Sequence, residues 1–555
     1  MSHNVNIACR LESQAAEQAH RRAVVEPCAS KAQNSSRTYR QLTFLQLEEL
    51  ASSYADAFSR SGIDKGMRVL IGLQPGVDLC AVSFGLFKLG AIPVFIDPGM
   101  GKTHLLNCVT KAQATALVGF PKVFVAALLN AQAFKSVKIK ISVGVCWLPG
   151  VNNLHKLKKR RGFFPAVELN DDDIAALLFT SGSTGPAKGV VYTQKIFNFQ
   201  IDVIKDQYGV TKDDVDMSVF PLFALFAISM GMTTVIPDMD TSCPAAAKPK
   251  RVLRVMEDQG VTFSFGSPAF WKVMADYCEK KNKKLISVRA LVMAGCSVEP
   301  ALHRRFLNGI LPEGADIFVP YGATESLPLC SMKGTDVIGF SASRSENGAG
   351  TCVGKVMSDD VTVKVIRITD EAIANWDESL ELQTGEIGEI VNCGPITTRE
   401  YYDAPEANEK SKIIDGEKVW HRMGDLGYFD EEGYLWFCGR KNERVQTVDK
   451  MLCTDPLENI FNTHEEVMRS ALVGVGADVN AEKVVLVVEP QDTGLLNDEP
   501  ARNALIQDLL KLADSRDDCC LITDVLVRSN FPVDVRHNAK IKRDILRDWA
   551  QAELA

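Results

Sequence analysis

The sequence predicts an α/β protein, and two observations carry that prediction. Short apolar runs alternate with helical segments through most of the chain, which is typical of layered, largely parallel sheets covered by helices. After Arg440 the pattern changes to a short mixture of helices and strands. Because 555 residues exceed what one hydrophobic core normally organises, we expect two domains. These are a large N-terminal domain of layered, mostly parallel sheets with helices (1–439) and a small α+β C-terminal domain (440–555).

The individual elements follow from the periodicity of the apolar residues. In the large domain we expect a helix at 45–60 and strands at 69–73, 91–96, 174–179, 261–265 and 291–294. In the small domain we expect helices at 455–466 and 499–514, and strands at 470–475, 483–488 and 521–527.

Composition and charge argue against several classes of protein. With 62 basic and 70 acidic residues, the formal net charge is −8, which gives no reason to expect nucleic-acid binding. No apolar run reaches the 18 residues of a membrane-spanning helix, so we expect no transmembrane segment, and residues 1–10 lack the apolar core of a signal peptide. The fifteen cysteines include no C-x-x-C pair. We therefore expect reduced thiols and a cytoplasmic protein.

A basic run at residues 156–161 precedes Phe163 and Phe164. Such a run could contact an anionic membrane surface or the acidic patch of a partner. A solvated basic surface is the commoner use of such a run, and it is the reading that we favour from the sequence.

The most informative segment runs from Leu178 to Gly189. An apolar strand leads into six small hydroxyl or glycine residues, whose backbone can approach an anion closely and whose N–H and O–H groups can donate to it. Lys188 then adds a compact positive charge. A flexible linker is the alternative, but apolar strands flank the segment on both sides. We therefore predict that a nucleotide polyphosphate is held by Thr180, Ser181, Gly182, Ser183, Thr184, Gly185 and Lys188.

This loop differs from the phosphate loop of kinases and ATPases, which reads G-x-x-x-x-G-K-[ST]. The run Gly99–Thr103 matches only the end of that pattern, since Ile96 stands where its first glycine belongs. The Ser/Thr/Gly-rich loop instead resembles the signature of the adenylate-forming enzymes, which include acyl-CoA synthetases, peptide-synthetase adenylation domains and luciferases.

Four further segments resemble motifs of that superfamily in the same order. They are Tyr321-Gly322-Ala323-Thr324-Glu325, Gly385-Glu386-Ile387-Gly388-Glu389, Gly424-Asp425 followed by Gly439-Arg440, and His537-Asn538-Ala539-Lys540. Together with the loop they cover the chain from about residue 40 to its end.

The resemblance implies ATP and Mg²⁺ as cofactors and a defined chemistry. A carboxylate attacks the α-phosphorus of ATP, which gives an acyl-adenylate and pyrophosphate. This reaction needs fixed donors and cations more than acid–base groups. Lys540, Glu325 and Thr184 are the implied catalytic residues, and Thr324 and Glu325 the implied magnesium ligands. The implied ATP-binding residues outside the loop are Gly295, Tyr321, Gly322, Ala323, Thr324, Asp425, Arg440 and Lys540. The small domain is then a mobile lid that rotates about the residues after Arg440.

Several residues depart from the pattern of CoA ligases. Ala224 stands where those enzymes usually carry a histidine, Asn442 where the hinge is usually Asp or Lys, and Asp449 where a glycine usually faces pantetheine. A carboxylate at Asp449 would repel the anionic CoA, so the use of CoA is in doubt. Phe226, Phe265 and Met230 are candidates to line a long apolar acyl pocket, although each is equally suited to a core.

Four segments, Pro221–Phe226, Tyr321–Pro328, Trp436–Lys441 and Val535–Ile541, resemble the β-lactone synthetases of bacterial long-chain olefin biosynthesis. Those enzymes adenylate a long-chain β-hydroxy acid, whose own hydroxyl then displaces AMP, and holding that hydroxyl beside the acyl carbon gives a large effective molarity. His537 is a candidate proton acceptor.

Three interpretations stay open. They are a β-lactone synthetase acting on a 2-alkyl-3-hydroxy acid, a long-chain fatty acid–CoA or fatty acyl-AMP ligase, and a non-catalytic nucleotide-binding subunit of an assembly with other olefin-pathway enzymes. The combination of Lys188, Glu325, Asp425, Arg440 and Lys540 argues against the third.

Overall fold

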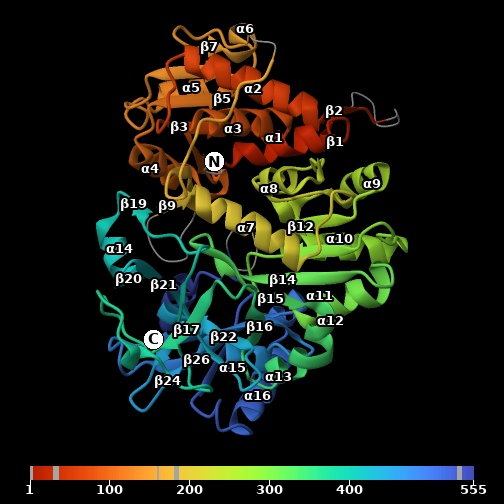
Figure 1. Ribbon diagram of the computed structural model, residues 1–555. Coiled ribbons are helices and arrows are strands. Elements are labelled where there is room, and N and C mark those ends of the chain that lie inside the picture. The colour runs from red at the N-terminus through yellow and green to blue at the C-terminus, as the bar shows by residue number, and fades with distance from the viewer. Residues whose placement is uncertain (1–3, 29–36, 159–161, 181–186, 534–540) are drawn as a thin grey trace.

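The computed structural model describes residues 4–28, 37–158, 162–180, 187–533 and 541–555. Two large β-sheets with helices between and around them form the N-terminal part, and a small sheet with its own helices forms the C-terminal part (Figure 1). No helix among the described residues is both long and apolar enough to cross a membrane. The described α-helices are α1 Ala8–Glu17, α2 Phe44–Arg60, α3 Val77–Leu89, α4 Lys102–Ala112, α5 Pro121–Leu129, α6 Leu154–Leu157, α7 Gln194–Gln207, α8 Phe223–Met230, α9 Pro249–Gln259, α10 Pro268–Lys281, α11 Pro300–Arg305, α12 Gly334–Asp336, α13 Ala342–Glu346, α14 Pro405–Ser411, α15 Thr454–Phe461, α16 Glu499–Asp514 and α17 Arg543–Glu553.

The first sheet follows the order β19-β9-β8-β4-β3-β5-β6-β7. Its strands are β3 Arg68–Gly72, β4 Ile92–Ile96, β5 Ala116–Gly119, β6 Ile139–Ser142, β7 Asn152–Asn153, β8 Ile174–Thr180, β9 Lys188–Thr193 and β19 Tyr401–Tyr402. Pairing is parallel from β8 to β7, while β8–β9 and β9–β19 are antiparallel. A strand from late in the chain, β19, therefore lies beside the strand that begins with Lys188.

The second sheet follows the order β17-β18-β21-β22-β16-β15-β14-β13-β12-β10-β11-β1-β2, with β20 paired to β21. Its strands are β1 Arg22–Pro27, β2 Tyr39–Thr43, β10 Val215–Asp216, β11 Thr233–Val235, β12 Phe263–Gly266, β13 Ala290–Met293, β14 Asp316–Ala323, β15 Ser326–Lys333, β16 Thr351–Val356, β17 Thr362–Ile366, β18 Gly388–Cys393, β20 Lys412–Asp415, β21 Lys418–Phe429 and β22 Leu435–Arg440.

This second sheet is mixed, which differs from the mostly parallel sheets that the sequence predicts. Pairing is parallel only from β14 to β1. From β14 to β17 it is antiparallel, because tight turns join several of these strands, such as the two residues between β14 and β15. The turn between β14 and β15 and the strands β21 and β22 of this antiparallel half carry residues of the candidate site.

One core joins the two sheets. Buried side chains of α2, α3, α7 and α8 pack in a single cluster with strand residues of both sheets, such as Val69 and Val118 of the first and Phe263 and Val292 of the second. In Figure 1, α7 crosses the molecule between the two sheets. Helix α2 begins at Phe44, one residue before its predicted start, because Thr43 and Gln46 form a reciprocal capping box at its N-terminus.

The C-terminal part contains the sheet β25-β26-β27, with β25 Val467–Val475, β26 Lys483–Pro490 and β27 Asp524–Val527, and the short hairpin β23 Val445–Gln446 and β24 Met451–Leu452. One of its core clusters draws only on residues between Val445 and Val527. Helix α16 has the predicted bounds, whereas α15 ends at Phe461 rather than at 466, because β25 begins at Val467.

Candidate functional site

The turn between β14 and β15 forms the centre of the candidate site. Ala323 pairs with Ser326, so Thr324 and Glu325 occupy the tip of a tight hairpin. Gly322 has φ +153°, and a Cβ there would lie 2.4 Å from the Ser326 carbonyl oxygen, so only glycine allows the strands to approach this closely. The hydroxyl of Tyr192 donates to the Thr324 carbonyl oxygen at 2.7 Å. The hairpin is therefore held in one conformation.

Glu325 and two lysines contact the same tyrosine side chain, Tyr401. The hydroxyl of Tyr401, on β19, donates to Glu325 Oε1 at 2.6 Å. Lys188 Nζ lies 4.7 Å from the centroid of the Tyr401 ring, and Lys412 Nζ lies 5.5 Å from it. The Thr398 backbone N–H donates to the Glu325 carbonyl oxygen at 2.9 Å, which ties the turn to the segment leading into β19.

Burial disfavours the protonated forms of the two lysines, so their pKa values fall below the ordinary value. Lys412 is buried and donates to the Thr398 carbonyl and hydroxyl oxygens, and burial lowers the pKa of Lys412 to about 7 even though Glu325 opposes the shift. Burial also lowers the pKa of Lys188, again against the attraction of Glu325. The two lysines therefore lie near acidic side chains, Glu325 for both and Glu400 for Lys412, and a polyanion bound here would favour their protonated forms.

A second cluster lies on the neighbouring strands. Asp425 of β21 and Arg440 of β22 face each other in register, and Arg440 pairs with Asp425 Oδ1 at 2.7 Å. The hydroxyl of Tyr321, on β14, donates to Asp425 Oδ2 at 2.8 Å. The Asp425 carboxylate raises the pKa of Arg440, and burial raises the pKa of Tyr321 well above its usual range. Because Tyr321 and Glu325 belong to one hairpin, β14 and its turn join the two clusters.

The structure describes only some of the predicted phosphate-binding residues. Thr180 closes β8 and pairs with Lys188, which opens β9, so the two strands bring the ends of the loop together. Ser181, Gly182, Ser183, Thr184 and Gly185 lie outside the described residues, as do His537 and Lys540. Gly295 follows β13 with φ +105°, and no described contact joins it to the two clusters.

Two of the three candidate acyl-pocket residues, Phe226 and Phe265, lie against one ring. Phe223 stacks on Phe226 at 5.8 Å and on Phe265 at 4.9 Å between centroids, and both of these rings are half-buried. Met230, at the end of α8, is 2% exposed and belongs to the main core. Ala224 is also buried there. The lining of an acyl pocket by these residues stays a prediction.

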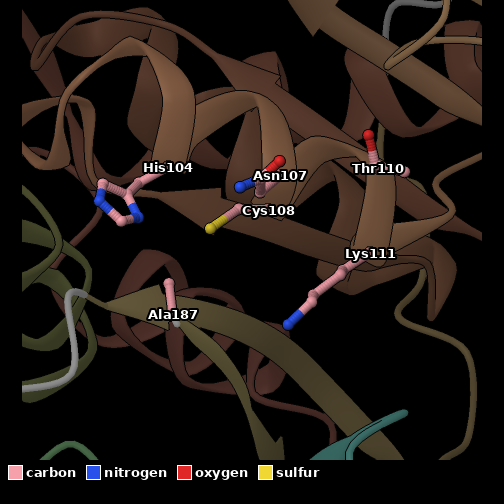
Figure 2. A pocket seen from close by; sticks show the side chains of 6 residues that line it. All are labelled: His104, Asn107, Cys108, Thr110, Lys111 and Ala187. Atoms are coloured by element: carbon pink, nitrogen blue, oxygen red, sulfur yellow. The ribbon is translucent and has the colours of Figure 1, made fainter. Parts of the chain in front are cut away.

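A separate cavity of about 240 Å³ lies beside the start of β9. Figure 2 shows His104, Cys108 and Lys111 on the side of α4 that faces Ala187, the residue before Lys188. None of the candidate acyl-pocket residues lines it, so this cavity neighbours the lysine and not the phenylalanines.

The segment 385–389, which resembles a superfamily motif, has a structural role. Glu389, buried on β18, accepts from Arg422 at 2.6 Å and from Lys441 at 3.1 Å. Lys441 also donates to the Thr369 carbonyl oxygen at 2.9 Å. The residues directly after Arg440 are therefore fixed to the large sheet. Asn442 and Asp449 are exposed, with Asp449 in the turn between β23 and β24.

The sequence analysis missed Tyr401 and Lys412, although both contact the predicted site. Neither belongs to a motif: Tyr401 is one of two adjacent tyrosines and Lys412 stands in a charged segment. A lysine opening an apolar strand-like run (Ile413-Ile414) was the available signal, because such a strand buries alternate side chains.

The two clusters combine a half-buried and a buried lysine, a carboxylate at a hairpin tip, and a carboxylate–guanidinium pair beside an aromatic ring. A family model described as AMP-binding enzyme matches residues 11–402. The chain belongs to this family, and it is an AMP-forming acid ligase.

The chain is also similar to individual members of this family. The chain is 39% identical to an olefin β-lactone synthetase of Stenotrophomonas maltophilia, over 100% of this chain and 99% of the relative. It is also 39% identical to an olefin β-lactone synthetase of Xanthomonas campestris pv. campestris, over 98% and 97%. The amide bond synthetase McbA from Marinactinospora thermotolerans has the same fold, with a TM-score of 0.77 at 22% identity over 98% of this chain and 99% of that one.

Proposed function

We propose that this protein uses ATP to adenylate a long-chain 2-alkyl-3-hydroxy acid and then closes the acyl-adenylate to a β-lactone. In the first step a carboxylate oxygen bonds to the α-phosphorus and pyrophosphate leaves. In the second step the 3-hydroxyl oxygen bonds to the acyl carbon, the hydroxyl proton is lost, and AMP leaves with the former carboxylate oxygen. The full-length 39% identity to two olefin β-lactone synthetases is the observation that carries the second step.

The first step is supported by the geometry around Glu325. We infer that the phosphates of ATP bind beside Lys188 and Lys412, which lie at the Tyr401 ring, and the pairing of the strands at the two ends of the loop 180–188 supports this assignment. Charge that develops on phosphate oxygens is best stabilised by such preorganised cations. We assign Thr184 and Lys540 to the same chemistry, with Lys540 bridging the α-phosphate and the substrate carboxylate.

Magnesium fits this site through the carboxylate of Glu325. Carboxylate and phosphate oxygens are the ligands that Mg²⁺ prefers, and Tyr401 fixes one oxygen of Glu325. No cluster of three or more His, Cys, Asp or Glu side chains that could hold a metal occurs among the described residues. A cation here therefore depends on the oxygens of ATP as well as on Glu325 and Thr324. When bound it neutralises the phosphate charge that develops during the transfer.

The ribose is assigned to the second cluster. Asp425 is buried and rigidly held by Tyr321 and Arg440, so its carboxylate can accept hydrogen bonds from ribose hydroxyls without moving. Gly295, Tyr321, Gly322 and Ala323 complete the proposed adenosine site.

The segment 440–555 is proposed to act as a lid. Lys441 is tied to Glu389 and to the Thr369 carbonyl oxygen, which favours a lid with a restricted rotation. An intramolecular second step needs no entry of a second substrate, so a restricted lid is compatible with lactone formation.

Product analysis tests the proposal. Pyrophosphate release is measured with a long-chain 2-alkyl-3-hydroxy acid and with palmitate, each with and without CoA, and the products are identified by mass spectrometry. The proposal expects turnover of the hydroxy acid without CoA and a product lighter than the acid by one water. Formation of palmitoyl-CoA, with no lactone from the hydroxy acid, would make the protein an ordinary CoA ligase.

A further inference from the structure

Although the chain as a whole has a negative net charge, one region of it is strongly basic. Residues 98–167 contain eleven lysines and arginines and no aspartate or glutamate. The remaining chain then holds 51 basic and 70 acidic residues, a net charge of −19. Neither cluster of the candidate site uses any residue of this region.

The part of this region after α4 forms one end of the molecule, whereas α4 lies beside the start of β9. Strands β5, β6 and β7 are consecutive at the edge of the first sheet, and α4, α5 and α6 belong to the same segment. In Figure 1 the labels α5, β5, β7 and α6 gather at the top, at the end opposite the blue C-terminal part.

Its cations are not neutralised by neighbouring carboxylates. The eight described lysines make no ion pair with any described acidic residue, and most are exposed. They are Lys102, Lys111, Lys122, Lys135, Lys138, Lys140, Lys156 and Lys158. Unpaired cations of one sign attract an anionic surface over a distance of about 8–10 Å at physiological salt.

The same end exposes large apolar side chains. Trp147 is 92% exposed and Leu129 is 78% exposed, and Val125, Leu128 and Val145 are also exposed. We call these five residues the apolar tip. Helix α5 buries Phe124 and Ala127 against the core while its outer face presents Val125, Leu128 and Leu129. A helix that is apolar on its outer face as well does not suit an interface with water.

The two segments of the apolar tip are neighbours. A Cβ built at Gly144 would lie 3.7 Å from Cδ of Pro121, the first residue of α5. Cys146 and Leu148, which flank Trp147, pack against the same core cluster as Phe124 and Ala127. The segment of Trp147 therefore lies beside the start of α5, and Leu128 and Leu129 lie about two turns further along the same helix.

We propose that this end docks on a membrane that contains anionic lipids, with the apolar tip inserted among the headgroups and the lysines contacting lipid phosphates. Tryptophan and leucine beside lysine is the combination that favours a bilayer interface. A second copy of the chain would bring like charges together, and a nucleic acid would leave the leucines in water. If the proposed substrate is correct, docking also gives access to an acid that dissolves in bilayers.

Vesicle co-sedimentation of the full chain tests the proposal. The vesicles are phosphatidylcholine alone and an equimolar mixture of phosphatidylcholine and phosphatidylglycerol. We expect binding to the mixture that weakens with added salt, and little binding to phosphatidylcholine alone. Lys135→Gln with Lys138→Gln should lower the bound-to-free ratio by about 30-fold, since each basic residue near an anionic surface contributes about fivefold.

Matched variants separate docking from general surface effects. Leu128→Gln with Leu129→Gln should lower binding by about tenfold or more, because exposed leucines gain on leaving water. Ile286→Gln and Val479→Gln remove exposed apolar side chains elsewhere (80% and 67% exposed) and should leave binding unchanged. Thermal unfolding checks that each variant is folded.

Three results would overturn the proposal: no binding to the anionic vesicles, equal binding of the tip variants and wild type, or binding to soluble polyglutamate in place of vesicles. The last would assign the surface to an acidic macromolecule. None of these results depends on which acid the protein activates, so they are distinguishable from a failure of the proposed function.

Discussion

Replacing Tyr401 with phenylalanine removes one hydrogen bond from the candidate site and leaves the ring in place. The hydroxyl donates to Glu325 Oε1 at 2.6 Å, while Lys188 and Lys412 lie 4.7 and 5.5 Å from the ring centroid. Phenylalanine keeps both cation–ring contacts, so the variant isolates the bond to the carboxylate. Glu325 then loses the partner that fixes the oxygen facing the proposed magnesium.

The magnitude follows from the charge on the acceptor. A hydrogen bond to a charged group contributes about 1.5–3 kcal/mol, so its full loss in the transition state lowers kcat/KM for adenylation by roughly 10- to 150-fold. The requirement for Mg²⁺ should rise as well, because Glu325 is less well oriented. Pyrophosphate release over a range of Mg²⁺ concentrations measures both effects.

A matched control exists on the surface. The hydroxyl of Tyr39 donates to Asp258 at 2.7 Å, in an exposed position away from the site. Tyr39→Phe therefore removes the same kind of bond and should leave pyrophosphate release unchanged. The reasoning is refuted if Tyr401→Phe is folded and retains wild-type kcat/KM and wild-type dependence on Mg²⁺.

Three further predictions concern charge. Asp425→Asn removes the partner of Arg440 and should raise the KM for ATP by roughly tenfold or more, measured by pyrophosphate release, since a bond between charged groups is lost; an unchanged KM contradicts the ribose assignment. Lys412 has a native pKa of about 7 against about 10.5 when unfolded, so the native state binds fewer protons between these values and stability rises with pH across that window. Lys412→Met should therefore have a higher free energy of unfolding than wild type at pH 6, and this advantage should be larger than at pH 10 by on the order of 4 kcal/mol. Urea unfolding at both pH values measures it, and the same difference between variant and wild type at the two pH values would contradict the prediction. Burial raises the pKa of Asp455 to about 7, so its protonated form stabilises the native state at low pH and that contribution is lost as pH rises from about 4 through 7; Asp455→Asn should stabilise the protein at pH 8 but not at pH 4, and a loss of stability at pH 8 would show that the carboxylate is needed against Thr351.

The local parts of this fold could be predicted from the sequence. The strand before the phosphate loop, expected at 174–179, is Ile174–Thr180, and the helix expected at 499–514 has those bounds. Both are decided by the periodicity of nearby apolar residues, which a sequence contains directly. The segment 321–325 could be singled out by its resemblance to a superfamily motif, because the residues of that motif are adjacent in the chain.

The rest depends on pairings between distant segments. Tyr401 reaches Glu325 because β19 pairs with β9, about two hundred residues earlier, with Tyr401 opposite Val190. Lys412 is buried because β20 adds to β21, and nothing in its own segment indicates a buried charge. The antiparallel half of the second sheet could not be predicted either, because an apolar run indicates a strand but not its direction relative to its neighbours.

The measurement that tests the central claim most directly follows the oxygen atoms of the carboxylate. The hydroxy acid is labelled with ¹⁸O at both carboxylate oxygens, and the AMP and lactone from one turnover are analysed by mass spectrometry. If the carboxylate is adenylated and the hydroxyl then displaces AMP, one labelled oxygen appears in AMP and one stays in the lactone. Unlabelled AMP with both labelled oxygens in the lactone would mean that ATP activates the hydroxyl, and would contradict the account.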